Sequence, residues 1–412
     1  MMSSVFAKQN KSLKDYFTVT LAYWSFTLTD GAIRMLVVLY FHQLGYSPLE
    51  IAMLFLLYEL MGIVTNFIGG WLGSRFGLNK IMHAGMLLQV FSLSMLAVPE
   101  SWLSVVYVML AQALSGIAKD LNKMSAKASV KLMFPEEAKG ALFRWVSFLT
   151  GSKNALKGVG FFLGGLLLNL FGFQVSLVIL ASALLVVLVL TNILLPKELG
   201  KAKVKIKFKH LFSKSREINQ LSAARVFLFG ARDVWFVVAL PVYLSSVLGW
   251  QHSEVGAFFA FWIIGYGIIQ SSAPKIIGKS HHHQGPDGAT ARMWAFILML
   301  ELFVMSALFS AGVSPGFVVV TGLIVFAVIF AINSAVHSFL ILDYSSHEQV
   351  SVDVGFYYMA NATGRLIGTV LSGWVFQQWG LEACLWLSAS FILATTLISN
   401  GLPVIKQELT KE

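Results

Sequence analysis

The chain has 412 residues, 57% of them hydrophobic and 12% charged, and its mean hydropathy is +0.74. Soluble domains carry about a quarter charged residues, so the composition excludes a soluble globular protein and indicates an all-α protein that crosses a membrane many times. A net charge of +10 is compatible with nucleic-acid binding, and the positions of the basic residues have to decide that question.

Apolar runs of membrane-spanning length recur from Phe17 to Val404. A helix needs about 20 apolar residues to cross the hydrocarbon core, so the chain has room for about twelve spans. The first run is full-length and lacks a small-residue cleavage site, which indicates a retained span rather than a signal peptide. The predicted spans are Tyr16–His42, Leu49–Gly73, Lys80–Val98, Trp102–Met124, Leu142–Phe171, Gln174–Leu195, Ile218–Leu248, Ser253–Pro274, Arg292–Ala311, Gly316–Leu340, Val354–Trp379 and Glu382–Leu402.

A long polar segment divides these spans six and six. We therefore expect an N-terminal six-helix half over residues 1–196, a basic linker over 197–217 and a C-terminal six-helix half over 218–412. The linker contains the run KAKVKIKFKH, which we interpret as a solvated cytoplasmic loop near anionic lipid headgroups.

Lysine and arginine collect on one side of the predicted bundle. The connections after the odd-numbered spans contain neither residue, whereas the N-terminus and four of the connections after even-numbered spans are basic. This is the positive-inside pattern of an even-numbered bundle with both termini in the cytoplasm. The excess positive charge is thus explained by membrane topology, and no nucleic-acid partner is expected.

The two predicted halves repeat each other. Asp30 precedes Tyr40 and then the segment LGYSPLEI, and Asp233 precedes Tyr243 by the same spacing and then LGWQHSEV. The match runs in the same direction, so it predicts two halves related by an axis along the membrane normal. That is the organisation of a major facilitator transporter, whose halves move around a central site.

The fifth and eleventh predicted spans extend the repeat, because glycines at the end of one match glycines at the end of the other. This alignment puts a cation in register on each span. The aligned pairs are Lys157 with Arg365, Lys153 with Asn361, Gly160 with Gly368, Gly165 with Gly373 and Gly172 with Gly380.

The fifth span contains the stretch TGSKNALKGVGFFLGG, in which Lys153 and Lys157 lie on the same helical stripe as Gly160 and Gly164. A charge at mid-membrane costs about 2.5–3.5 kcal/mol on insertion scales, so a lipid-facing helix is excluded. The glycines predict close packing against a neighbouring helix.

The connection after the second span resembles the superfamily's loop signature and suggests a gating loop. Its matching residues are Gly70, Arg75, Gly77 and Lys80. Ser74 stands where the signature has an acid, which puts a charge latch at this loop in doubt.

Ionisable residues inside spans are functional candidates by default. Midplane cations outnumber midplane acids, which indicates an anion site between the halves; the alternative is that the charges only hold helices together. We expect Asp30 to pair with Arg34 four residues on, and the neighbours Arg232 and Asp233 to pair with other helices. The cations are Arg34, Lys119, Lys153, Lys157, Arg225, Arg232 and Arg365, and the acids are Asp30, Glu59, Asp120, Asp233 and Glu301.

Lysines recur at every fourth position from Lys119 through Lys123 and Lys127 to Lys131. The simpler interpretation is a helix emerging into the cytoplasm with a solvated basic face, and the alternative is an access path that attracts anions. The run from His281 to His283 lacks a fixed geometry, so no metal is expected. No cofactor, catalytic constellation or ATPase loop is predicted, and we expect no enzyme activity.

Several stretches resemble the ArsJ family of organoarsenical efflux permeases, within the major facilitator superfamily. They are much more specific than the superfamily signatures and coincide with the charged spans. They are AYWSFTLTDGAIRMLVVLYFHQLGYSP, LSGIAKDLNKMSAK, TGSKNALKGVGFFLGG, FLFGARDVWFVVALPVY and ANATGRLIG.

The resemblance implies an antiporter-like exporter in the bacterial cytoplasmic membrane. Members work with a glyceraldehyde-3-phosphate dehydrogenase that makes 1-arseno-3-phosphoglycerate, and export of this unstable anion confers arsenate resistance. We further expect a monomer whose partners are this small phosphorylated substrate, the dehydrogenase as a functional partner and the lipid bilayer. The alternatives are a sugar-phosphate or organophosphate carrier and a membrane sensor that transports nothing.

For such an exporter, we assign separate roles to the central residues. The expected substrate ligands are Lys157, Arg365, Lys153, Arg232, Arg34 and Asn361; the proton-coupling candidates are Asp30, Asp233, Glu59 and Glu301; and the cytoplasmic access path contains Lys119, Asp120 and Lys123.

Overall fold

The computed structural model describes residues 2–46, 48–133, 139–195, 215–250, 252–277 and 285–404, and every regular element within these ranges is helical. Most of the predicted linker and the three histidines at 281–283 lie outside the described residues. The elements are α1 (Met2–Gln43), α2 (Pro48–Leu54), α3 (Leu56–Phe76), α4 (Leu78–Leu96), the short 3-10 helix η1 (Glu100–Trp102), α5 (Val105–Met133), α6 (Lys139–Leu194), α7 (Arg216–Phe236), α8 (Ala239–Ser246), α9 (His252–Ile277), α10 (Gly288–Ser310), α11 (Pro315–Tyr344) and α12 (Val350–Ser399).

The predicted all-α fold is confirmed, with two kinds of difference in how spans map onto helices. α6 and α12 each contain two spans, joined at Gly172 (φ 71°) and Gly380 (φ 75°), where the backbone leaves helical geometry. Positive φ is accessible to glycine at little cost, and these are two glycines that the repeat aligns. In addition, two spans are each divided between two helices: α2 and α3 form one of them, and α7 and α8 form the other.

Seven described helical segments are long and apolar enough to cross a membrane, judged by length and composition alone. α6 has 56 residues and α12 has 50, so each can cross a hydrocarbon core of about 30 Å twice.

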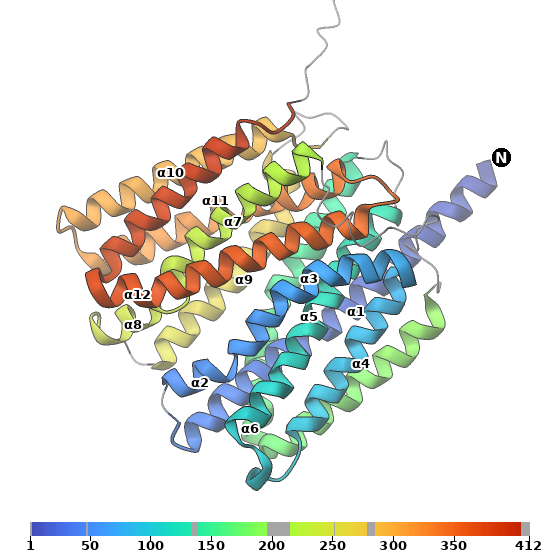
Figure 1. Cartoon of the computed structure of the whole chain (residues 1–412), viewed down its shortest axis with the longest axis horizontal. Coiled ribbons are helices and arrows are strands. Elements are labelled where there is room, and N and C mark those ends of the chain that lie inside the picture. The colour runs from blue at the N-terminus through green and yellow to red at the C-terminus, as the bar shows by residue number, and fades with distance from the viewer. Residues whose placement is uncertain are drawn as a thin grey trace, which may run out of the picture.

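Helices α1–α6 gather on one side of the molecule and α7–α12 on the other (Figure 1). One apolar core lies within residues 32–181 and a second within residues 228–392. A third core draws on both groups, from Tyr16 and Leu142 on one side to Phe339 and Leu402 on the other. Its residues lie at the ends of the helices that the basic loops assign to the cytoplasm.

Polar contacts also join the two groups at the cytoplasmic end. The Lys139 ammonium lies 2.9 Å from the Asp343 carboxylate, and the Ser351 hydroxyl donates to the carbonyl oxygen of Gly70 at 2.6 Å. The rings of Phe143 and Phe339 contact edge to face at 5.4 Å. The structure is therefore closed at the cytoplasmic end.

Glycines let α1 pack closely on α6 and α7 on α12. A Cβ on Gly160 would lie 2.8 Å from the carbonyl oxygen of Leu28, and one on Gly368 would lie 2.6 Å from that of Gly230. The close packing predicted for the fifth span is confirmed, and the aligned glycine makes the equivalent contact on the eleventh.

These contacts predict that alanine lowers stability at the closely packed glycines but not at glycines with open space around them. Gly160→Ala and Gly368→Ala force backbones apart and should each cost about 1–3 kcal/mol, which lowers the melting temperature of the purified protein. Gly165→Ala is the matched control, since its Cβ would lie 3.7 Å from Leu39, and Gly373→Ala meets nothing within 4 Å. Equal melting temperatures across all four variants would contradict the packing argument.

Candidate functional site

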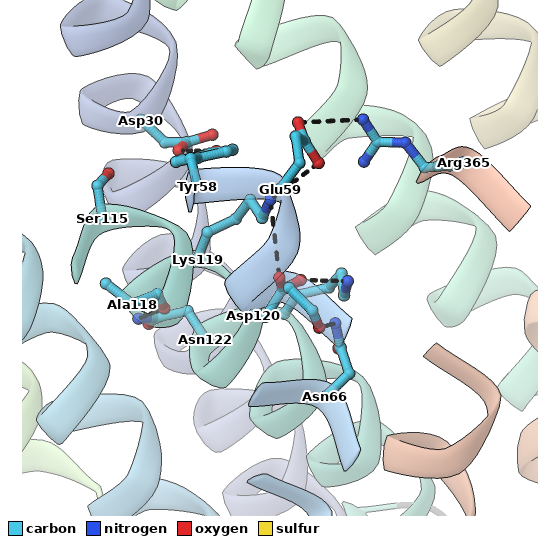
Figure 2. Close-up of polar contacts among 12 residues, drawn as sticks. Asp30, Tyr58, Glu59, Asn66, Ser115, Ala118, Lys119, Asp120, Asn122 and Arg365 are labelled. Carbon is cyan, nitrogen blue, oxygen red and sulfur yellow. Dashed lines mark hydrogen bonds and ion pairs between the residues drawn. The ribbon is translucent and has the colours of Figure 1, made fainter. Parts of the chain in front are cut away.

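Side chains from three helices converge on the carboxylate of Glu59 on α3, and Figure 2 shows two of these partners, Lys119 and Arg365. The Glu59 oxygens lie 3.1 Å from the Arg34 guanidinium on α1, 3.9 Å from the Lys119 ammonium on α5 and 3.3 Å from the Arg365 guanidinium on α12. The Arg365 contact joins helices from the two sides of the molecule.

Asp233 on α7 is a second carboxylate in the same cluster and is fully buried. The Arg365 Nε lies 3.1 Å from one of its oxygens and an Arg232 nitrogen lies 2.6 Å from the other. The expectation that Arg232 and Asp233 pair only with other helices is thus wrong for Arg232, because its long side chain folds back onto its neighbour. Arg365 bridges Glu59 and Asp233.

Asp30 accepts a hydrogen bond of 2.5 Å from the hydroxyl of Tyr58. The expected direct ion pair of Asp30 with Arg34 does not form: Arg34 contacts Glu59 and interacts with Asp30 only at longer range. Tyr58 was not among the predicted site residues, but its ring centroid lies 4.7 Å from the Arg34 guanidinium and 3.9 Å from the Lys119 ammonium. Tyr58 directly precedes Glu59, an acid within a predicted span, and its aromatic face attracts the cations that gather around that acid. This position was the signal available in the sequence.

The lysine series on α5 points inward. Lys127 is 4% exposed and Lys131 5%, so the expected solvated basic face is wrong: α5 continues to Met133, and helices from both sides cover it. Lys123 contacts Asp120, which also lies 3.6 Å from Lys119. The residues expected to form an access path are thus packed beside the Glu59 cluster.

Lys153 and Lys157 differ from the other central cations. Among the described residues, neither has a carboxylate within ion-pair distance; Lys153 donates to Asn154 at 3.4 Å, and Lys157 lies 5.7 Å from the ring centroid of Phe161. Lys157 interacts electrostatically with Asp30 and Arg365, which places its charge beside the cluster.

The central charges do not balance. Burying a charge is expensive unless an opposite charge accompanies it, so an excess of cations favours an anionic ligand that completes the site. The described cluster combines the cations Arg34, Lys119, Lys123, Lys153, Lys157, Arg232 and Arg365 with the acids Asp30, Glu59, Asp120 and Asp233, which leaves three more positive than negative charges.

Two predicted site residues lie apart from this cluster. Asn361 accepts a hydrogen bond of 2.9 Å from Arg225. Glu301 lies on α10, and its buried carboxylate oxygens have no hydrogen-bond partner in the described part of the chain.

The predicted gating loop connects α3 to α4. Gly77 ends α3 and begins α4 at φ 96°, and its N–H donates to the carbonyl oxygen of Gly73 at 2.9 Å. Arg75 and Lys80 are exposed, and the Arg75 guanidinium lies 5.3 Å from the ring centroid of Trp71. Gly70 packs against Ser351 at the closed cytoplasmic end.

Comparison with known proteins agrees with this architecture. The sequence profile of the Major Facilitator Superfamily matches residues 19–351. The chain belongs to this superfamily. It is thus a multi-pass membrane protein with the fold of a secondary transporter for small molecules, embedded in a lipid bilayer. A comparison with curated protein sequences gives no match.

Solved structures with the superfamily fold resemble this chain along nearly its whole length. A bacterial homologue of the iron transporter ferroportin, in an outward-facing state, is 16% identical with a TM-score of 0.75 and covers 93% of this chain and 98% of its own. The human organic anion transporter MFSD10 is 14% identical with a TM-score of 0.75, covering 94% and 99%. The proton:xylose symporter XylE is 13% identical with a TM-score of 0.73, covering 94% and 95%. Such identities show the fold alone.

Proposed function

We propose that this superfamily member is a secondary-active exporter of a phosphorylated organoarsenical anion, 1-arseno-3-phosphoglycerate, and confers arsenate resistance. The observation that carries the proposal is the cation excess around Glu59 and Arg365, at the level where both sides of the molecule meet. A small molecule with a phosphate at one end and an arsenate ester at the other complements such a site. The resemblance of the charged stretches to the ArsJ family supplies the arsenical.

In this proposal, residues 1–196 and 218–412 are the halves that move against each other. Lys157 and Arg365 hold the oxyanion groups of the substrate. The Arg365 guanidinium can make two parallel hydrogen bonds to one phosphate or arsenate group. Lys153, Arg232 and Arg34 assist, and Glu59, Asp30 or Asp233 takes up protons. The transporter works as a monomer in the bacterial cytoplasmic membrane, with a glyceraldehyde-3-phosphate dehydrogenase as its functional partner.

The test is arsenate tolerance in an arsenate-sensitive bacterium. Cells that produce both this protein and the dehydrogenase should grow at arsenate concentrations at least about tenfold higher than cells with either protein alone, because only the pair makes and removes the organoarsenical. If the pair gives no tolerance while membrane vesicles still accumulate phosphate esters, the protein is an organophosphate carrier and the arsenical proposal fails.

A further inference from the structure

Two buried cations lie between the Glu59 cluster and the closed cytoplasmic end, and both contact only neutral groups. Arg225 on α7 is 3% exposed and Lys127 on α5 is 4% exposed. Arg225 donates to the Asn361 carbonyl oxygen at 2.9 Å and to the Ser334 hydroxyl at 3.3 Å, and Lys127 donates to the Ser338 hydroxyl at 3.3 Å. In the described part of the chain, no carboxylate lies within ion-pair distance of either.

The two cations interact with each other electrostatically, and two tyrosines link them. The Arg225 guanidinium lies 5.1 Å from the ring centroid of Tyr357, and the Lys127 ammonium lies 5.0 Å from that of Tyr358. The two rings contact each other at 5.1 Å. The charges thus occupy one continuous group of side chains on α5, α7 and α12.

Unsatisfied polar atoms lie on α11 and α12, the helices that contribute the hydrogen-bond partners and the tyrosines of this group. Among the described residues, the Tyr357 hydroxyl, the Asn333 side-chain amide and both ring nitrogens of His337 are buried without a hydrogen-bond partner, and the Tyr358 hydroxyl interacts with Ser338. Asn333 and His337 lie on α11, which also carries Ser334 and Ser338. Buried polar atoms are nearly always paired, and leaving one unpaired is destabilising. So many at one place indicate a missing polar ligand.

The contrast with the Glu59 cluster identifies the ligand's charge. There, four carboxylates accompany the cations; here, among the described residues, only hydrogen-bond donors and neutral groups contact Arg225 and Lys127. Two like charges taken out of water repel each other, and burying each of them is strongly unfavourable unless an opposite charge is present. An anion with several acceptor oxygens would neutralise both cations and accept from the tyrosine hydroxyls and the Asn333 amide.

We propose that Arg225, Lys127, Tyr357 and Tyr358 form a second oxyanion site, on the cytoplasmic side of the Glu59 cluster, for a tetrahedral phosphate or arsenate group. Lys127 comes from α5 and the other three from α7 and α12, so the site is assembled only when the two sides of the molecule meet. This second site depends on the proposed function only for the identity of its complete ligand. Its oxyanion chemistry is tested with inorganic phosphate.

The experiment measures the melting temperature of the purified full-length protein in detergent, with phosphate or with chloride at equal ionic strength. Phosphate should raise the melting temperature of the wild type. Arg225→Gln should need at least about tenfold more phosphate for the same rise in melting temperature, since it removes charge-assisted hydrogen bonds. Without phosphate, Arg225→Gln should melt no lower than the wild type, because it removes an uncompensated buried charge; a merely structural arginine would give a lower value.

Arg144→Gln is the matched control, because Arg144 is an exposed arginine on α6, and it should respond to phosphate as the wild type does. If Arg225→Gln does not fold, Lys127→Gln provides an independent variant with the same expected loss. The site is refuted if phosphate and arsenate fail to stabilise the wild type, if both variants keep the full response, or if only phosphatidylglycerol stabilises the protein. Arsenate tolerance does not enter this test, so its failure leaves the proposed export untouched.

Discussion

Cells that carry Arg365→Gln together with the dehydrogenase are expected to tolerate arsenate no better than cells without the transporter, a fall in export of at least about 100-fold. Arg365 bridges Glu59 on α3 and Asp233 on α7 at 3.3 and 3.1 Å. Glutamine keeps some hydrogen bonding but removes the positive charge and the forked donor geometry that holds two acceptors at once. It therefore removes both a proposed substrate ligand and the polar link between the halves.

Two comparisons separate loss of the site from loss of the protein. Arg144→Gln changes an exposed arginine and should keep full tolerance at the same membrane abundance. Arg365→Lys keeps the charge and should recover only part of the function, because an ammonium lacks the planar fork that reaches both carboxylates. Lys157→Ala should lose export as Arg365→Gln does. Full tolerance in both Arg365→Gln and Lys157→Ala would show that neither residue binds the substrate.

The fold could be predicted from the sequence because its determinants are local. Membrane-length apolar runs can only be helices, and the basic loops fix their sidedness. The repeat aligns Gly172 with Gly380, and the structure gives both residues the same backbone conformation at the same kind of turn. The interruptions between α2 and α3 and between α7 and α8 were not predicted, because apolar composition continues through them.

The central charges could also be predicted, but their partners could not. A spacing of four residues suggested that Asp30 and Arg34 pair, whereas Tyr58 and Glu59 from α3 take these positions. Partner choice depends on how each helix is rotated and offset against its neighbours, which one helix's sequence does not contain. The same limit explains the lysines of α5: a basic stripe looks alike whether it faces water or, as with Lys127, the closed interior.

Glu59→Gln is expected to tighten anion binding and yet reduce net export. The Glu59 carboxylate contacts Arg34, Lys119 and Arg365 and offsets part of their positive charge, so it competes with any substrate anion for the same donors. Without its charge, the affinity for the anion should rise at least about tenfold, a change of about 1.4 kcal/mol. Release of the anion on the opposite side of the membrane should slow in proportion, because no Glu59 carboxylate then displaces the substrate from the cations.

The same variant tests whether Glu59 carries the coupling proton. Everted membrane vesicles are supplied with the dehydrogenase, its substrates and arsenate, and internal arsenic is measured with the pH gradient present or collapsed while the potential is kept. The potential alone drives anion export by about 2.3 kcal/mol per charge per 100 mV. Wild-type transport should therefore slow but not stop when the gradient collapses, and Glu59→Gln should be insensitive to the gradient.

Glu301→Gln is the comparison, because Glu301 is the proton-coupling candidate that lies on α10, apart from the Glu59 cluster, and its carboxylate has no hydrogen-bond partner among the described residues. It should retain the wild-type dependence on the pH gradient. Undiminished wild-type transport after collapse of the gradient would remove the proton role of Glu59, and an unchanged anion affinity in Glu59→Gln would remove its role as internal counter-ion. Because the affinity and the gradient dependence are measured separately, Glu59 can prove to be a counter-ion without being a proton carrier.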